Sequence, residues 1–352
     1  MTVLSAGPRR TQPRILLLGC GSIGRRHAQN LRALGVEQLI VFDLQTDRRD
    51  QLAREVDAET ETTLDACWKR HPDAVLIALP TALHLPLALE AARRGCHLLI
   101  EKPLADRWQG VEELLSIAGQ HELITLVGCN LRFHPGLRRI KCLLAEQAIG
   151  RVVAARIEVG QYLPDWHPWE DYRQSYSARR ELGGGVILDA IHELDYARWL
   201  LGEITRVTCC AEKLSDLEID TEDTAALLLQ FQSGAMGEIH LDYIQRAYSR
   251  TCQIIGDQGT LHWDYSTGQV RFYSAHDQQW RVYAKPSEWQ PNQMYVDEAS
   301  HFLNCVDHTE TPALDVFEAA QVLQLALAAK TAARERRWID LGGNAWNPNP
   351  TL

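Results

Sequence analysis

The stretch "RILLLGCGSIGRRHAQNL" (residues 14–31) decides the fold. The continuous apolar run Ile15–Leu18 predicts a short buried strand, and the residues after the glycines have the composition of a helix. Between them lies a G-x-G-x-x-G turn made by Gly19, Gly21 and Gly24. The first glycine permits the tight turn, the second lets the backbone approach a pyrophosphate, and the third lets the helix pack on the strand. In this context the motif predicts a dinucleotide-binding unit.

A second apolar run, "QLIVFD" (residues 38–43), predicts another strand that ends at Asp43. A carboxylate at this position accepts hydrogen bonds from the adenosine ribose and repels a 2′-phosphate, so it favours NAD over NADP. Arg48 and Arg49 follow closely and weaken that preference, which leaves NADP as an alternative. A purely structural aspartate at the strand end is the other interpretation.

The alternation of strand and helix patterns continues through residues 73–80, 96–105 and 123–130. Such alternation predicts a parallel, doubly wound sheet, and ligands bind such sheets at the carboxyl ends of the strands. The strand-end residues should therefore meet in one crevice: Gly19, Asp43, Pro80, Thr81, Glu101, Lys102 and Asn130.

After residue 150 the pattern changes to alternating strands with tight turns, followed by helical segments at about 294–307 and 313–335. The predicted fold class is α/β, with an N-terminal Rossmann sheet and a C-terminal α+β domain built on a large, mostly antiparallel open sheet. We expect a flexible tail at 1–12, an NAD(P)-binding domain at 13–130, a substrate-binding and oligomerisation domain at 131–340, and a tail at 341–352. One face of the second sheet is expected to bury against another subunit, giving a homodimer or homotetramer.

Composition excludes several classes of partner. A net charge of −10 argues against nucleic acid or an anionic membrane surface. No apolar run approaches the roughly 18 residues of a membrane-spanning helix. The 9 cysteines are scattered and form no C-x-x-C pair, which predicts reduced thiols in a cytoplasmic protein. No His/Cys/Glu group has zinc-ligand spacing, so no metal is predicted.

The stretch "GGGVILDAIHELDYARWLLG" (residues 183–202) carries the strongest catalytic pattern. Asp189, His192 and Asp195 are spaced i, i+3, i+6, which places neighbours on one face of a helix. A histidine flanked by carboxylates suits a general base, because a carboxylate orients the ring and stabilises its protonated form. The competing interpretation is a polar stripe that faces solvent.

The segment 161–182 is rich in aromatic and basic residues. Aromatic faces beside polar groups are typical of sugar pockets, and arginines can bind a carboxylate or phosphate. For each arginine, an equally good interpretation is that it extends from an ordered surface loop into solvent and binds no substrate. The aromatic residues are Tyr162, Trp166, Trp169, Tyr172 and Tyr176, and the arginines are Arg173, Arg179 and Arg180.

Together, "GCGSIGRRHAQNL", "ALPTALHLPLALEAARRGCHLLIEKPLA" and the glycine-led Asp…His stretch resemble the glucose–fructose oxidoreductase, inositol dehydrogenase and MocA family from about residue 13 to about 335. The resemblance implies NAD(P)-dependent hydride transfer to or from a sugar, a cyclitol or a sugar derivative. "NLRFHP" (Asn130–Pro135) is similar to a branch associated with surface sugars, so a nucleotide sugar or glycan precursor is included.

The resemblance also implies roles for residues. Lys102 of the E-K-P motif would reach both nicotinamide and substrate, with Asp189 and His192 beside the reacting carbinol. Many relatives have a D-x-x-x-H spacing, one residue longer than here, so either Asp189 or Asp195 is the expected partner of His192. The cofactor residues would be Gly19, Gly21, Ser22, Ile23, Gly24, Asp43, Leu79, Pro80, Thr81, His84, Glu101, Lys102 and Asn130. The substrate residues would be Lys102, Arg132, Tyr162, Trp166, Arg173 and His192.

Two other functions fit the same motifs. A glycosidase or lyase can keep NAD bound and use transient oxidation to weaken a neighbouring bond, and a non-catalytic protein can bind NAD as a sensor. The intact set of Lys102, Asp189 and His192 argues against the second.

Overall fold

The computed structural model describes residues 13–166 and 168–341, so the tail expected at 1–12 and all but Leu341 of the one expected at 341–352 lie outside it. The first half is built on a six-stranded sheet in the order β3-β2-β1-β4-β5-β6, with parallel neighbours throughout. The predicted doubly wound parallel sheet is confirmed. Its strands are β1 (Ile15–Leu18), β2 (Leu39–Phe42), β3 (Glu59–Thr60), β4 (Ala74–Ile77), β5 (His97–Glu101) and β6 (Thr125–Gly128).

Helices alternate with these strands, as the apolar periodicity predicts: α1 (Ser22–Ala33), α2 (Thr46–Glu55), α3 (Leu64–Trp68), α4 (His84–Arg93) and α5 (Val111–Gln120). The strand order reverses between β1 and β4, which pair directly. This switch point leaves a crevice at the carboxyl ends of the strands, where ligands bind in open α/β sheets.

The second half is built on a nine-stranded sheet in the order β14-β13-β12-β11-β7-β10-β9-β8-β15. All neighbours are antiparallel except β7 and β10, so the predicted mostly antiparallel sheet is confirmed. The strands are β7 (Val152–Gly160), β8 (Ile204–Glu212), β9 (Thr224–Phe231), β10 (Met236–Asp242), β11 (Ser249–Gly256), β12 (Gly259–Asp264), β13 (Gln269–Ser274), β14 (Gln279–Tyr283) and β15 (Ile339–Asp340).

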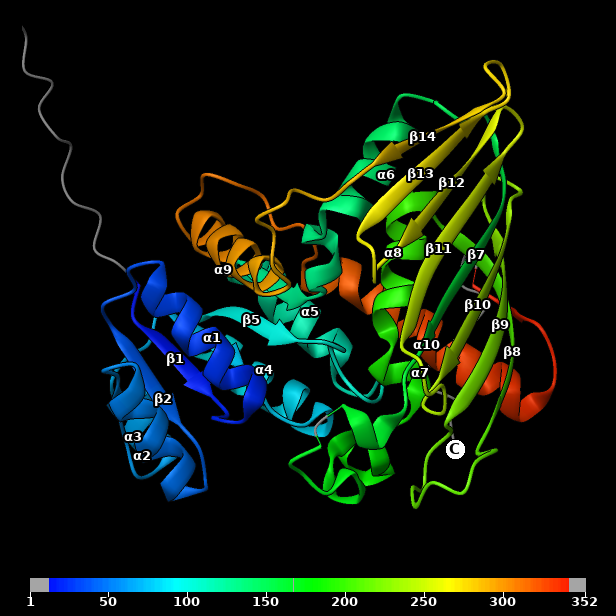
Figure 1. Ribbon diagram of the computed structural model, residues 1–352. Helices are drawn as coiled ribbons and strands as arrows, with labels where there is room; N and C mark the ends of the chain where they lie inside the picture. The colour runs from blue at the N-terminus through cyan, green and yellow to red at the C-terminus, as the bar shows by residue number, and fades with distance from the viewer. Residues whose placement is uncertain (1–12, 167, 342–352) are drawn as a thin grey trace, which may run out of the picture.

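Helices cover only one face of this sheet within the described residues (Figure 1). They are α6 (Pro135–Ala145), α7 (Val186–Asp189), α8 (Ile191–Leu201) and α10 (Val316–Glu335). Side chains alternate accordingly along β9, where Leu227 and Leu229 are buried and Leu228 is exposed. The opposite face carries side chains that no described helix packs against.

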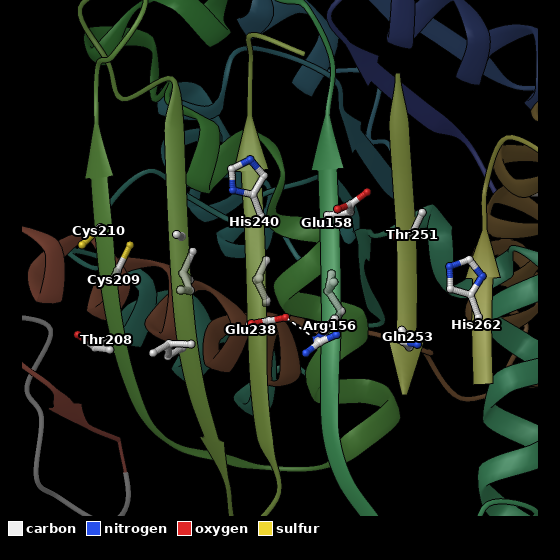
Figure 2. Close-up of a pocket in the computed structure, with 15 residues that line it drawn as sticks. Arg156, Glu158, Thr208, Cys209, Cys210, Glu238, His240, Thr251, Gln253 and His262 are labelled. Carbon is white, nitrogen blue, oxygen red and sulfur yellow. Dashed lines mark ion pairs between the residues drawn. The ribbon is translucent and has the colours of Figure 1, made fainter. Parts of the chain in front are cut away.

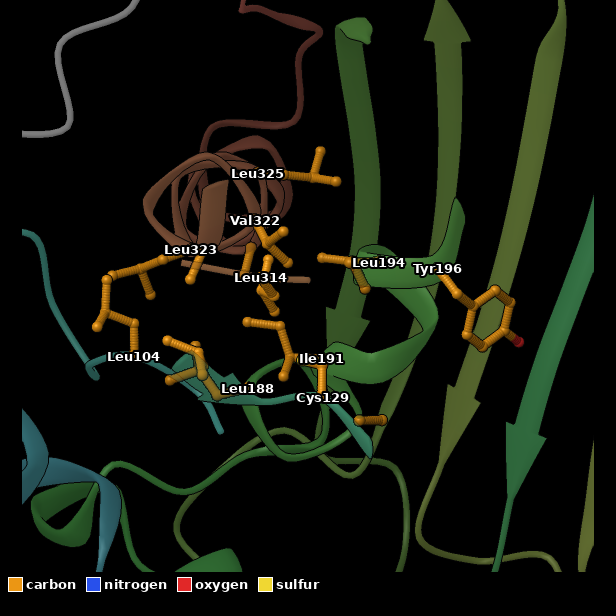
Figure 3. Close-up of a cluster of buried hydrophobic side chains, with 14 of the residues drawn as sticks. Leu104, Cys129, Leu188, Ile191, Leu194, Tyr196, Leu314, Val322, Leu323 and Leu325 are labelled. Atoms are coloured by element: carbon orange, nitrogen blue, oxygen red, sulfur yellow. The ribbon is translucent and has the colours of Figure 1, made fainter. Parts of the chain in front are cut away.

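A shared apolar core joins the two halves (Figure 3). Leu104 and Cys129 come from the first half, Ile191 and Leu194 come from α8, and Leu323 comes from α10. All of them are at most 3% exposed. The two halves therefore pack against each other through a common close-packed interior beside the crevice.

Helix α9 (Asn292–Val306) returns from the second half to pack on the first. Its Ala299 and Phe302 belong to the buried cluster that contains Leu17 of β1 and Leu31 of α1. Packing therefore crosses the boundary expected at residue 130, and the exact domain limits stay a prediction.

We expect Phe302→Ala to lower the free energy of unfolding by about 3–5 kcal/mol, because it leaves a cavity in a close-packed cluster. Phe302 is 1% exposed, whereas Phe317 on α10 is 46% exposed. The matched variant Phe317→Ala should change stability by less than about 1 kcal/mol. Urea unfolding of both variants makes the comparison, and equal effects would contradict this packing of α9.

Candidate active site

A cleft of about 680 Å³ lies at the switch point between the two halves. Its volume is within the range typical of small-molecule sites. One end is lined by Gly21, Ser22 and Ile23 at the start of α1, and the other by Trp166, Tyr176 and His192. Leu79, Pro80, Thr81, Glu101, Lys102 and Asn130 line it between them, as the convergence of strand ends predicts.

The glycine turn fits a dinucleotide. A Cβ added to Gly24 would lie 1.9 Å from the carbonyl oxygen of Gly19, and Gly19 has a φ of +98° that favours glycine. A Cβ on Gly21 would meet nothing within 4 Å, because Gly21 faces the open cleft. Gly21 is also the N-cap of α1 and provides no side-chain cap. The first N–H groups of α1 are therefore available to the pyrophosphate of a bound NAD.

Asp43 braces this turn from the end of β2. Its carboxylate accepts the N–H of Cys20 at 2.8 Å and the N–H of Gln45 at 2.8 Å. Gln45 and Arg48 line the cleft, whereas Asp43 is not among its lining residues. Arg49 is buried and bonds Asp50 at 2.8 Å, so of the two arginines only Arg48 lines the cleft.

His84 does not line the groove, contrary to the prediction from the resemblance. It is 1% exposed, and its ring nitrogens lie 2.7 Å from the carbonyl oxygens of Pro103 and Leu79. Burial lowers the pKa of His84, although its contacts with both carbonyl oxygens act to raise it. His84 thus ties the segment after β4 to the E-K-P motif and acts on the cleft through these neighbours.

Lys102 and Asp189 form an ion pair across the two halves. The Lys102 Nζ donates to Asp189 Oδ1 at 2.9 Å and to the Asp189 carbonyl oxygen at 2.8 Å. Burial acts to lower the pKa of Lys102, but the Asp189 carboxylate more than offsets it, and the pKa is raised. Lys102 therefore stays a charged donor in the cleft at neutral pH.

Asp189 is held by hydroxyl groups as well. Its carboxylate accepts hydrogen bonds from Tyr176 and Ser177 at 2.6 Å each and from Tyr243 at 3.1 Å. Burial acts to raise the pKa of Asp189, but the charge of Lys102 and these hydrogen bonds hold it below its usual value. The carboxylate stays ionised and anchors Lys102.

The predicted coupling of His192 to a carboxylate is wrong. Asp189 ends α7, the helix is interrupted at Ala190, and His192 belongs to the separate helix α8. Asp195 is also on α8, but it faces Arg132, to which it bonds at 2.7 Å. Among the described residues neither aspartate hydrogen-bonds His192, and its Nδ1 is buried without a partner.

His192 nevertheless lines the cleft beside Lys102. Burial, and then the positive charges of Lys102 and Arg250, hold the pKa of His192 well below its ordinary value. The ring is therefore neutral at pH 7. A neutral histidine next to a charged lysine provides one proton acceptor and one proton donor at the same point of the cleft.

Some of the other predicted substrate residues line the cleft, and others do not. Trp166 lines the cleft, together with Tyr172 and Tyr176 from the same segment. Tyr162 is not among the lining residues, and Arg246 lies 3.6 Å from its ring centre. Two of the predicted substrate residues are arginines that form ion pairs within the chain and do not line the cleft.

Arg132 is 6% exposed and is bound to Asp195 and to the carbonyl oxygen of Ala313. Arg173 is exposed outside the cleft and bonds Asp171 at 2.8 Å and Glu218 at 3.3 Å. Both arginines already hold carboxylates of this chain, so neither is free to bind an acidic substrate from its present position.

One buried cluster was missed by the sequence analysis because its members come from α1, β5 and α9. His27 Nε2 lies 2.7 Å from Glu101 Oε1, and Glu298 lies beside them with both oxygens unpartnered. Burial, and then the charge of Glu101, raise the pKa of Glu298 well above its usual value, so Glu298 is protonated. These three ligand-type atoms lie within 4.8 Å of one another, but His27 and Glu101 already bind each other. No metal role is assigned to them.

Comparisons with known proteins agree with this geometry. The model of an oxidoreductase family with an NAD-binding Rossmann fold matches residues 13–129, and the model of the GFO/IDH/MocA C-terminal domain matches residues 137–262. The chain is 28% identical over 342 residues to myo-inositol 2-dehydrogenase of Thermotoga maritima, covering 93% of this chain and 98% of that one. It is 27% identical to the scyllo-inositol 2-dehydrogenase (NAD(+)) of Bacillus subtilis, covering 94% and 96%.

Among solved structures, levoglucosan dehydrogenase in complex with NADH has a TM-score of 0.86 at 21% identity, covering 94% of this chain and 99% of that one. At this identity the likeness concerns the fold. Within residues 13–166 and 168–341 no helix is long and apolar enough to cross a bilayer.

The two glycines make a matched test of the cradle. Gly24→Ala should lower the melting temperature, because its Cβ would lie 1.9 Å from the Gly19 oxygen. Gly21→Ala should leave the melting temperature without NAD unchanged and weaken NADH binding at least about tenfold, because the Cβ enters the open cradle. Thermal unfolding and NADH fluorescence titration provide the two readouts. Unchanged NADH affinity in Gly21→Ala would contradict the assignment of the cradle.

Proposed function

The chain belongs to the GFO/IDH/MocA family of NAD-binding oxidoreductases, and we propose that it interconverts a secondary alcohol and a ketone of a sugar, a cyclitol or a sugar derivative such as a nucleotide sugar. One observation carries the proposal: a charged Lys102, anchored by Asp189, lies beside a neutral His192 in the cleft that holds the dinucleotide cradle. The inositol dehydrogenases among the relatives support the substrate class.

Oxidation of an alcohol requires a group that takes the hydroxyl proton. We assign this role to His192, which is neutral because burial and two neighbouring cations lower its pKa. Lys102 donates a hydrogen bond to the same oxygen and stabilises its developing negative charge. Asp189 keeps Lys102 charged and in place, with Tyr176 and Ser177 holding the carboxylate. When bound, NAD supplies the acceptor of the hydride.

Two alternatives are not favoured. A glycosidase or lyase that uses transient oxidation would share the cleft, but the inositol-specific relatives are named as dehydrogenases. A non-catalytic NAD-binding protein would have no need of the buried Lys102–Asp189 pair or of a neutral histidine beside it. Burial of such ionisable groups is costly and is typical of functional sites.

We expect His192→Ala to lower kcat for alcohol oxidation by about 10²–10⁴-fold, the usual contribution of a general base. Purified protein with NAD is assayed for NADH absorbance against inositols, hexoses, uronates and nucleotide sugars. Wild-type activity that persists in His192→Ala would contradict the assigned base. Products that form without NADH, and only when NAD is bound, would support the bond-cleaving alternative instead.

The pH profile follows from the direction of the His192 pKa. A base whose pKa is lowered stays unprotonated to lower pH, so kcat/KM for oxidation should hold through pH 6.5, the ordinary histidine value. It should fall only as the pH drops through the depressed pKa. An acidic limb centred at or above pH 6.5 would show that burial, Lys102 and Arg250 do not lower the pKa of His192 as described.

We also propose that the exposed face of the second sheet joins two copies of the chain. A hollow of about 550 Å³ on this face is lined from β8, across β9, β10, β7 and β11, to β12 (Figure 2). It mixes apolar side chains with an Arg156–Glu238 ion pair of 2.8 Å. Leu228 is 42% exposed, and Met236 on the same face is 55% exposed. Exposed apolar side chains on one face are typical of a subunit interface.

Leu228→Glu should therefore shift the protein toward a smaller species in light scattering, because it places like charges opposite each other in a two-fold interface. Phe317→Glu, also an exposed apolar position but on α10, is the matched control. A wild-type monomer, or equal effects of both variants, would contradict this interface. The proposal includes a cytoplasmic location, which the 9 free thiols support.

A further inference from the structure

The part of the cleft beyond Lys102, called here the substrate end, is described by the acidic and basic side chains that line it. This substrate end is lined by described residues between Leu163 and Leu182 together with His192. Three cations line the whole cleft: Arg26, Arg48 and Lys102. Arg48 lies in α2 beside Gln45, and Arg26 lies in α1, 4.5 Å from the Tyr295 ring centre, so both come from helices of the first half.

Three cations at or near the substrate end have carboxylate partners. Lys102 holds Asp189, and Arg250 holds the buried Glu193 at 2.9 Å. Arg173 binds Asp171, which is itself a lining residue, so that carboxylate is neutralised from outside the cleft. Within residues 13–166 and 168–341, no cation that lines the substrate end lacks an acidic partner.

Glu170 is the exception to this pairing. It lines the cleft, its side chain is exposed, and it has no ion-pair partner among the described residues. Aromatic rings lie on the same segment, at Trp166, Tyr172 and Tyr176. The faces of such rings attract cations, and a carboxylate adds a direct charge interaction. An ammonium group would find attraction at this end, whereas a carboxylate would meet Glu170 and no unpaired cation.

We infer that this cleft selects sugars or cyclitols that carry an amine, accepts neutral ones, and rejects those with a carboxylate near the reacting carbinol. The inference rests on the proposed function for the location of the substrate and deepens it by naming the substrate's charge. It distinguishes amino sugars from uronates, which are otherwise similar in size and hydroxyl pattern.

The test uses glucosamine, glucose and glucuronate as a matched series of probes. Their dissociation constants for the enzyme–NADH complex are measured by NADH fluorescence, and NADH formation is measured separately from NAD. Glucosamine should bind more tightly than glucose, and glucuronate roughly tenfold or more weakly than glucosamine. Added salt should reduce the difference, because it screens exposed charges.

Glu170→Gln should reduce the ratio of glucosamine to glucose affinity by about 2- to 5-fold, the usual worth of an exposed charge pair. Glu181→Gln removes the same charge from an exposed position outside the cleft, where Glu181 pairs with Arg179, and should leave the ratio unchanged. The inference is overturned if glucuronate binds as tightly as glucosamine. It is also overturned if the ratio of glucosamine to glucose affinity is the same in wild type and in Glu170→Gln. Selective binding with no NADH from any sugar in the wider panel would support the charge selection and contradict the proposed oxidation.

Discussion

The site depends on one interaction, the ion pair between Lys102 and Asp189. Lys102 follows β5 of the first half, and Asp189 ends α7 of the second, so the pair exists only when both halves are folded and packed together. The close approach uses glycine at Gly183, where a Cβ would lie 2.7 Å from the Thr81 Cβ. Burying such a pair is costly, and the hydrogen bonds from Tyr176, Ser177 and Tyr243 offset that cost.

His192 is not positioned by the flanking aspartates that the sequence pattern predicted as its partners. Its helix, α8, is anchored by two buried ion pairs: Glu193 with Arg250 and Asp195 with Arg132. These pairs anchor the helix that carries His192. Burial, and then the cations Lys102 and Arg250, lower the pKa of His192, so the site holds a proton acceptor and a proton donor side by side without a carboxylate between them.

Sequence patterns predicted the two sheets because strand and helix periods are local and the glycine turn has a defined geometry. The strand-end rule also placed Lys102, Pro80 and Asn130 in one cleft. Partners of charged groups were harder to predict, since they are set by tertiary packing. Arg132 and Asp195 are 63 residues apart and bind each other, so the arginine was mistaken for a substrate ligand. A break at Ala190 separated Asp189 from the helix of His192, and nothing in the residue types predicted it. His27, Glu101 and Glu298 meet only because α9 returns to the first half.

The most direct test of this account is a double-mutant cycle on the ion pair, using Lys102→Met, Asp189→Asn and both together. The quantity measured is kcat/KM for the substrate that the NADH assay identifies, with melting temperatures as the check on folding. Because Asp189 acts through Lys102, the double variant should be no less active than Lys102→Met alone. Independent, additive losses from the two substitutions would contradict the central claim that the two residues work as one unit.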